Sequence, residues 1–431
     1  MSLADATALS VGIIIGSSIF SLVGVGAQIA GRDLPLSLAL SSLIALFVAY
    51  NYAKLGSTYI SNAGPIEYII RGLGDRLYTG IAAMMLWFIY VSSLALFAKT
   101  LAGYTLALAG LPLSSLNMAL IEALSISFFV ALNFKGSKAV GRAEVFLVAV
   151  KLFILMLFII AGFFTIKTAY LKPVTDQPHL KGVIYAATLF FLSYTGFGLI
   201  TNASENIENP RRNVPLAIYL SLLIASLVYI GVSIVAVGNL PVPELVRSKE
   251  YALAEAAEPF LGRLGFSLIS IGAIISVSSA MNSSIYGGAN VAYSMAKKGE
   301  IPEFFERTAW KHEPEGLYMT ALLGFILALS VNLEGVAAVI SSSFIVIYIG
   351  VILSHLKLVD ETNASKTIVE LSLILVLMVL IVLLYSQYAS NRSGFYVILL
   401  TYSVFTVVEY AYRKYRGRRF KARNTGGAAG I

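Results

Sequence analysis

Long apolar stretches alternate with short polar segments along most of the chain. A helix that crosses the hydrocarbon core of a bilayer needs about 20 apolar residues. Hydropathy and helix-breaking residues predict twelve such helices, at residues 8–29, 36–56, 79–105, 116–133, 143–165, 183–203, 214–238, 265–295, 317–334, 337–356, 367–386 and 394–412. The pattern therefore predicts an all-α integral membrane protein without a separate soluble domain.

Two of the connecting segments are longer than the others. Residues 57–78 are expected to run along the inner face of the membrane, and residues 239–264 have room for a short helix. The N-terminus has neither a charged region nor a small-residue cleavage site, so we expect the first span to be retained in the mature protein.

Composition agrees with this class and narrows the chemistry. Of the 431 residues, 58% are hydrophobic and only 13% are charged, which is too little charge for a soluble surface. There is no cysteine, and the three histidines lie far apart in the sequence. These counts exclude disulfides and thiol nucleophiles and argue against a His-rich metal site. The sequence predicts neither a metal nor a cofactor.

The net charge of +8 fits a membrane topology better than a nucleic-acid partner. If the N-terminus is cytoplasmic, most of the lysines and arginines fall in cytoplasmic loops, as the positive-inside rule requires. Residues 413–431 then form a basic cytoplasmic tail that can contact anionic lipids. We expect a multi-pass protein of the cell membrane with both termini in the cytoplasm and no nucleic-acid partner.

Two spans contain weak helix formers at mid-membrane depth. The first span carries glycines and serines between Gly12 and Phe20, and the sixth carries Ser193 to Gly198. Paired breaks in corresponding halves are typical of inverted-repeat transporters with a midplane site. The sequence thus predicts two five-helix repeats, residues 1–165 and 183–356, followed by two additional helices in residues 367–412.

A broken helix can bind a small zwitterion such as an amino acid. Free N–H groups at a half-helix N-terminus attract a carboxylate, and free carbonyls at a half-helix C-terminus attract an ammonium group. Close packing of helices through small residues is the alternative explanation for one such cluster. Two clusters in matching positions favour the binding interpretation.

Lysine 151 lies two to three turns inside the fifth span, among apolar residues. A charge at this depth is costly, so the side chain is expected to face the bundle interior, where desolvation favours loss of its proton. Such a lysine is a natural coupling site for a proton-driven carrier, and snorkelling to the headgroups is the alternative. For Lys99, nearer the outer surface, snorkelling is the favoured interpretation. Ser276 and Ser279 share one face of the eighth span, where polar contacts between helices are the alternative to a site.

Three segments resemble the amino acid–polyamine–organocation (APC) family. They are residues 16–20 (GSSIF), 202–215 (NASENIENPRRNVP) and 296–302 (AKKGEIP), and the similarity is greatest to its proton-coupled, sodium-independent archaeal members. The resemblance covers nearly the whole chain. It implies the LeuT-type fold of two inverted five-helix repeats, with helices one and six broken and two extra helices at the C-terminus.

The resemblance also implies the residues of the site. Lys151 corresponds to a lysine whose amine replaces the sodium ion of sodium-coupled relatives, near the carbonyl of Gly12 and the hydroxyl of Ser276 or Ser279. The remaining assignments concern the substrate: amides of Ser17, Ser18 and Ile19 for its carboxylate, carbonyls of Ile14, Leu192, Ser193 and Thr195 for its ammonium group, and Ser284 beside its side chain. Many relatives have a glycine at position 18 and a glutamate at position 198, where this chain has serine and glycine.

We therefore expect a proton-coupled, sodium-independent symporter of amino acids with broad specificity, which uses alternating access and favours neutral substrates. The main alternative is an amino acid exchanger without net proton movement. An ion channel is disfavoured because no ring of charge marks a pore. A membrane-embedded enzyme is disfavoured because no histidine cluster, cysteine or base partner for a serine is evident. Nothing in the sequence identifies a non-transporting sensor.

Overall fold

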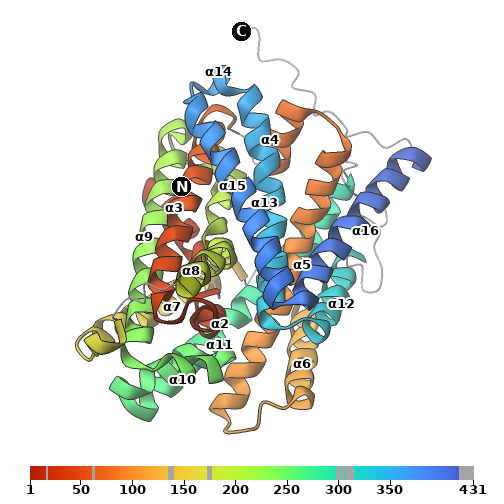
Figure 1. Cartoon of the computed structure of the whole chain (residues 1–431). Helices are drawn as coiled ribbons and strands as arrows, with labels where there is room; N and C mark the ends of the chain where they lie inside the picture. The colour runs from red at the N-terminus through yellow and green to blue at the C-terminus, as the bar shows by residue number, and fades with distance from the viewer. Residues whose placement is uncertain are drawn as a thin grey trace.

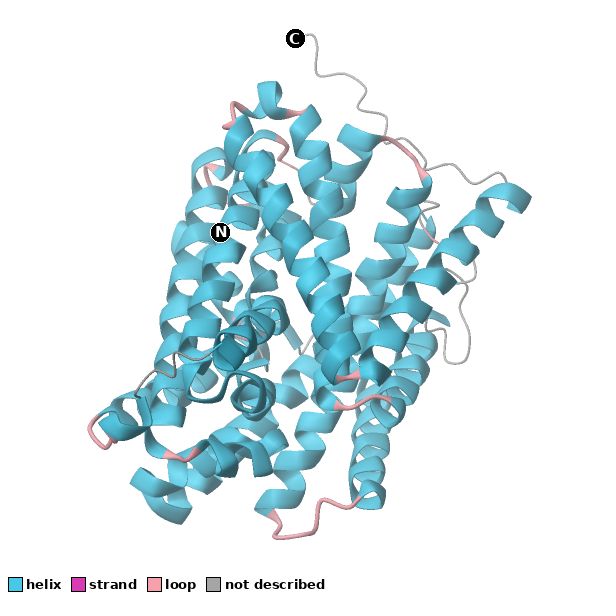
Figure 2. Cartoon of the chain, viewed as in Figure 1, coloured by secondary structure: helices cyan, strands magenta, loops and turns pink. Residues whose placement is uncertain are grey.

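The computed structural model describes residues 1–15, 18–60, 64–133, 140–171, 177–297, 301, 305 and 315–416. Within these ranges every regular element is a helix (Figures 1 and 2). The α-helices are α1 (Leu3–Ile14), α2 (Ser18–Ala30), α3 (Leu34–Thr58), α4 (Gly64–Leu73), α5 (Leu77–Leu108), α6 (Ser115–Asn133), α7 (Val140–Phe163), α8 (Gln177–Phe190), α9 (Pro210–Asn239), α10 (Val242–Arg247), α11 (Ala252–Lys297), α12 (Glu315–Ser330), α13 (Leu333–Lys357), α14 (Val359–Thr362), α15 (Lys366–Ser390) and α16 (Arg392–Arg416). The 3₁₀ helices are η1 (Gly31–Asp33), η3 (Thr168–Leu171), η4 (Phe191–Asn206) and η5 (Lys249–Tyr251).

Each of the twelve predicted spans overlaps helical segments of the described chain, and the number of membrane crossings stays a prediction. In the described part of the chain, nine helical stretches are long and apolar enough to cross a membrane. Three shorter apolar helices, Leu3–Ile14, Val148–Phe163 and Gly316–Ser330, overlap the first, fifth and ninth predicted spans. The protein is therefore an all-helical membrane protein with nine candidate spans among its described residues.

Residues 57–78 contain more order than a surface loop. They include α4, which lies beside α13 (Figure 1) and buries Tyr68 and Ile69 completely. The Ser354 hydroxyl of α13 donates a hydrogen bond to the Ile69 carbonyl at 3.2 Å. Gly64 and Gly74 bracket α4 with φ of 70° and 76°, a region that glycine adopts without a steric penalty. The segment is thus a short helix packed into the bundle.

Residues 239–264 contain the short helix α10, as predicted, and then η5 and the start of α11. Helix α11 is kinked at Gly262, which has φ of 61° and ψ of −161°. The predicted span 265–295 corresponds to the part of α11 that follows this kink. The first part of α11 is buried through Leu253, Ala256 and Ala257.

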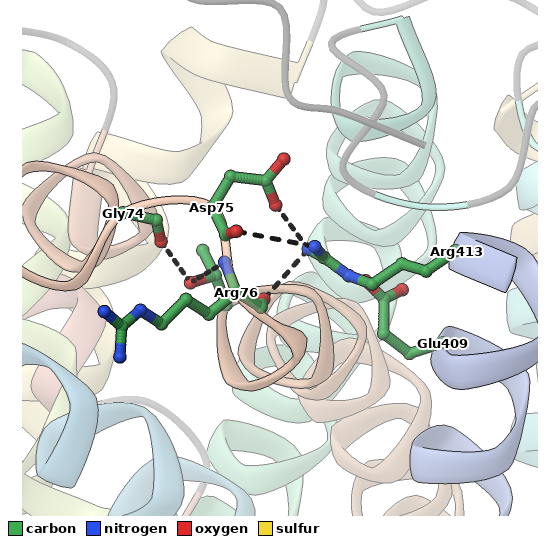
Figure 3. A network of polar contacts seen from close by, with 6 residues as sticks. Gly74, Asp75, Arg76, Glu409 and Arg413 are labelled. Carbon is green, nitrogen blue, oxygen red and sulfur yellow. Dashed lines mark hydrogen bonds and ion pairs between the residues drawn. The ribbon is translucent and has the colours of Figure 1, made fainter. Parts of the chain in front are cut away.

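Arg413 begins the predicted basic tail, yet it belongs to a network of polar contacts (Figure 3). Helix α16 continues to Arg416, and Arg413 forms ion pairs with Asp75 and with Glu409, whose carboxylate lies 2.7 Å from Nε. Arg413 also donates to the carbonyl of Arg76 at 2.9 Å. Glu409 is fully buried. Arg413 is therefore held by two carboxylates, one of them on the turn before α5, while lipid contact by the basic tail stays a prediction.

Gly80 is the residue of α5 that makes room for Glu409. A Cβ atom at this position would lie 1.9 Å from Glu409 Oε1. We expect Gly80→Ala to displace the carboxylate from Arg413 and to destabilise the protein by about 2 kcal/mol, as overpacking does elsewhere. Thermal unfolding of the purified protein in detergent measures this. Gly231→Ala is the control, because its nearest neighbour would be the flexible Ile159 Cδ1 at 3.2 Å. Equal unfolding temperatures for the two variants would contradict the prediction.

Candidate functional site

The first predicted break separates α1 from α2. Helix α1 ends at Ile14, and the amide of Ile15 still donates to the Val11 carbonyl at 2.8 Å. Helix α2 begins again at Ser18. Gly16 and Ser17 lie outside the described residues, so the predicted carboxylate contact of Ser17 stays a prediction.

The second predicted break is a change of helix type. Helix α8 ends at Phe190, and the chain continues as the 16-residue 3₁₀ helix η4. Runs of 3₁₀ helix longer than three or four residues are uncommon and often mark functional hinges. Within η4 the hydroxyls of Thr195 and Thr201 donate to the carbonyls of Leu192 and Gly198, at 2.7 and 2.6 Å. The sixth predicted span is therefore discontinuous in geometry.

The two segments meet at a cavity of about 180 Å³. This is well above the ~10–15 Å³ that a single water molecule needs. Gly196 allows the close approach, since a Cβ atom there would lie 2.9 Å from Ile13 Cγ2. Six of the eight residues that were predicted to bind substrate line this cavity: Ile14, Ser18, Leu192, Ser193, Thr195 and Ser284. Ile19 is buried but is not part of the lining.

Apart from Ile13 and Gly196, the rest of the cavity wall comes from α5 and α13. These residues were not predicted from the sequence, and they are mostly apolar or aromatic: Leu86, Ile89, Tyr90, Ser93, Leu96, Phe97, Ile340 and Phe344. Among the described residues that line the cavity, none is charged. The cavity can therefore take a small ligand whose side chain is neutral.

Two tyrosines hold the backbone of the two segments together. Tyr229 of α9 donates to the Ile14 carbonyl and lies 3.2 Å from the Ser193 carbonyl and 3.3 Å from Ser18 Oγ. Tyr348 of α13 donates to the Thr195 carbonyl at 3.0 Å. The Leu192 carbonyl accepts from Thr195, so all four carbonyls predicted to meet an ammonium group already have protein donors nearby. Each carbonyl oxygen has two lone pairs and can accept a second hydrogen bond.

Lys151 is buried, with 6% of its surface exposed, and its Nζ donates to the Gly12 carbonyl at 2.6 Å. The prediction that this side chain faces the bundle interior is confirmed. Gly12 permits the contact because a Cβ atom would lie 2.7 Å from Val148 Cγ2 on α7. The amine therefore ties α7 to the last turn of α1 before the break.

The two predicted serines lie on α11, next to α7. Gly272 packs so closely on α7 that a Cβ atom would lie 2.5 Å from Ile154 Cδ1. Ser276 and Lys151 each lie about one helical turn from that contact. The Ser276 hydroxyl is buried and has no hydrogen-bond partner within the described chain, whereas Ser279 is partly exposed.

Lys99 does not snorkel as predicted. Its Nζ lies 3.7 Å from Oε1 of Glu122 on α6, and the two side chains are 15% and 2% exposed. Glu122 is 23 positions later in the sequence, and only the packing of α6 on α5 shows the pairing. The prediction was wrong because a buried carboxylate satisfies the amine without any reach to the headgroups.

Comparison with known proteins agrees with this architecture. Residues 1–408 match the family profile described as amino acid permease. An uncharacterized protein of Methanocaldococcus jannaschii is 55% identical over 420 residues, which are 97% of each chain. The inner membrane transport protein YbaT of Escherichia coli is 28% identical over 91% of this chain and 92% of its own. The branched-chain amino acid permease BcaP of Bacillus subtilis is 27% identical over 84% and 82%. A match over nearly the whole chain shows that this protein belongs to the amino acid permease family of APC transporters, and that it is a transporter and not an enzyme.

Proposed function

We propose that this permease is a proton-coupled, sodium-independent symporter of amino acids with broad specificity. The observation that carries the proposal is the hydrogen bond from the buried Lys151 amine to the Gly12 carbonyl. A cation at this place joins α7 to the broken first span, as a bound sodium ion would. Unlike a sodium ion, an amine can lose its charge by releasing a proton while the side chain stays in place.

The cavity between α1, α2 and η4 is the proposed substrate site. It offers backbone carbonyls that can each accept a second hydrogen bond, together with the hydroxyl of Ser193, which is buried without a hydrogen-bond partner in the described chain. A ligand carboxylate fits the N-terminus of α2 and an ammonium group fits the carbonyls of Ile14 and Thr195. The uncharged wall favours neutral amino acids.

The same proposal includes the finer architecture. Twelve spans would form a LeuT-type fold, with inverted repeats at residues 1–165 and 183–356, two further spans in residues 367–412, and a basic tail. Support comes from the paired discontinuities at α1–α2 and α8–η4, each at the start of one repeat. The chain would lie in the cell membrane with both termini in the cytoplasm, as the distribution of lysine and arginine favours.

The transport cycle follows from these contacts. With Lys151 protonated, α1 and α7 are held together and the cavity binds an amino acid from outside. The helices around the cavity then reorient, and the substrate leaves on the other side. When Lys151 releases its proton, its hydrogen bond to Gly12 loses the contribution of the charge, about half of its strength. The weakened contact permits the return of the empty carrier.

Uptake of radiolabelled alanine into proteoliposomes tests the proposal. We expect an inward proton gradient to drive accumulation without sodium, and a protonophore to abolish it. Uptake that ignores the gradient but needs amino acid inside the vesicles would show an exchanger instead. A requirement for sodium would refute the assignment of the cation role to Lys151.

A further inference from the structure

A second cavity, of about 390 Å³, lies where α2 ends and where α8 and α13 begin, against the last turns of α15. It shares no lining residue with the central cavity. Beside this cavity α8 approaches α2 so closely that a Cβ atom on Gly182 would lie 2.3 Å from the Ile29 carbonyl oxygen. In the proposed orientation this end of the bundle faces outside. We call this cavity the peripheral pocket.

The peripheral pocket brings together one cation and one carboxylate that do not pair with each other. Lys181 is exposed, and no hydrogen bond or ion pair engages it in the described part of the chain. Glu334 is partly buried, and its carboxylate accepts from Gln387 Nε2 at 3.2 Å. Gln387 is only 2% exposed, and its Oε1 has no hydrogen-bond partner among the described residues.

We propose that the peripheral pocket binds a second amino acid molecule as a zwitterion. The ligand's ammonium group would pair with Glu334 and its carboxylate with Lys181. A simple cation would leave Lys181 without an ion pair. A simple anion would leave Glu334 without one in the pocket, although Lys249 lies near enough to attract its carboxylate. A zwitterion provides a partner for both pocket residues. Tyr185 and Leu189 provide an apolar wall for the ligand's side chain.

Three helical segments connect the two cavities. Leu189 lines the peripheral pocket, and Leu192, three residues later, lines the central cavity. On α13, Glu334 lines one cavity and Ile340 the other. Helix α2 contributes Ser18 to the central cavity and its opposite end to the peripheral pocket. A ligand that holds α2, α8 and α13 together would change affinity at the central site, and the effect would be reciprocal.

Equilibrium binding of radiolabelled alanine to the purified protein in detergent tests this inference, which rests on the proposed function for the central site. We expect two alanine molecules per wild-type chain. Glu334→Gln should weaken the second site by about tenfold or more, because it removes a charge-assisted hydrogen bond, and should leave the first intact. Glu370→Gln, on the exposed end of α15, is the matched control and should bind two.

The remaining site in Glu334→Gln shows that the variant is folded. Exchanging the charges in the double variant Lys181→Glu/Glu334→Lys should restore the second site, because a zwitterion can bind in the opposite direction. One alanine per wild-type chain, unchanged by Glu334→Gln, would overturn this inference alone, whereas no binding at all would refute the proposed function.

A lipid headgroup that carries an ammonium and a phosphate has similar chemistry. Alanine binding is therefore measured in nanodiscs of phosphatidylglycerol, with and without phosphatidylethanolamine. This comparison shows whether a free amino acid or a lipid headgroup occupies the pocket. We expect two alanine molecules per chain in both. A second site that is lost when phosphatidylethanolamine is present would assign the pocket to the headgroup and overturn the proposal.

Discussion

Replacing Lys151 with alanine is expected to abolish proton-driven alanine uptake, with a loss of at least about 100-fold, or about 2.7 kcal/mol. The variant removes the amine that donates to the Gly12 carbonyl and leaves no side chain at position 151 to gain and lose a proton. Initial uptake rates in proteoliposomes under a fixed proton gradient measure the loss. Lys366→Ala, whose side chain is 72% exposed on α15, is the matched control and should transport normally.

Lys151→Arg tests whether transport needs only a positive charge at position 151 or also the loss of a proton from it. A guanidinium group keeps a positive charge at any physiological pH, so it can hold α1 to α7 but cannot let go by deprotonation. We expect this variant to bind alanine and to fail in net uptake. Wild-type uptake by Lys151→Arg would exclude proton release from residue 151 as the coupling step and would leave only a structural role.

The second large effect is expected for Tyr229→Phe. The hydroxyl of Tyr229 is shared between the Ile14 and Ser193 carbonyls, which belong to the two discontinuous segments. Its removal leaves buried carbonyls without this donor, which costs about 1–3 kcal/mol. We expect uptake at low alanine concentration to fall about tenfold, the equivalent of about 1.4 kcal/mol.

A second tyrosine variant in the same uptake assay shows whether the loss is specific to the Tyr229 hydroxyl. Tyr219 lies on the same helix, is only partly buried and has no hydrogen-bond partner among the described residues, so Tyr219→Phe should transport as the wild type does. If the two phenylalanine variants behave alike, Tyr229 does not tie the segments together.

The sequence predicted an all-helical membrane protein correctly, because membrane helices need long apolar runs and few other structures contain them. It also placed Lys151 correctly, since an isolated charge in an apolar span must turn inward. The cavity walls on α5 and α13 were not predicted. These helices are apolar on all sides, so no periodicity indicates which side chains face a ligand and which face lipid.

Partners that lie far apart in the sequence were also missed. Lys99 was assigned to the headgroups and Arg413 to the tail because Glu122 and Asp75 lie on other helices or turns. Tyr229 and Tyr348 could have been noticed, since a buried tyrosine hydroxyl usually needs a hydrogen-bond partner. The sequence does not reveal which partner it finds, because many backbone carbonyls near a break are available.

The length of η4 has a mechanical consequence. A 3₁₀ helix rises about 2.0 Å and turns about 120° per residue, whereas an α-helix rises about 1.5 Å and turns about 100°. Each residue of η4 that changed to α-helix would shorten the segment by about 0.5 Å and rotate everything beyond it by about 20°. Four such residues would move the Ser204 end by about 2 Å along the axis and about 80° around it. In a segment of 16 residues in this form, a change of helix type would therefore couple a shift along the helix axis to a rotation of the residues that line the cavity.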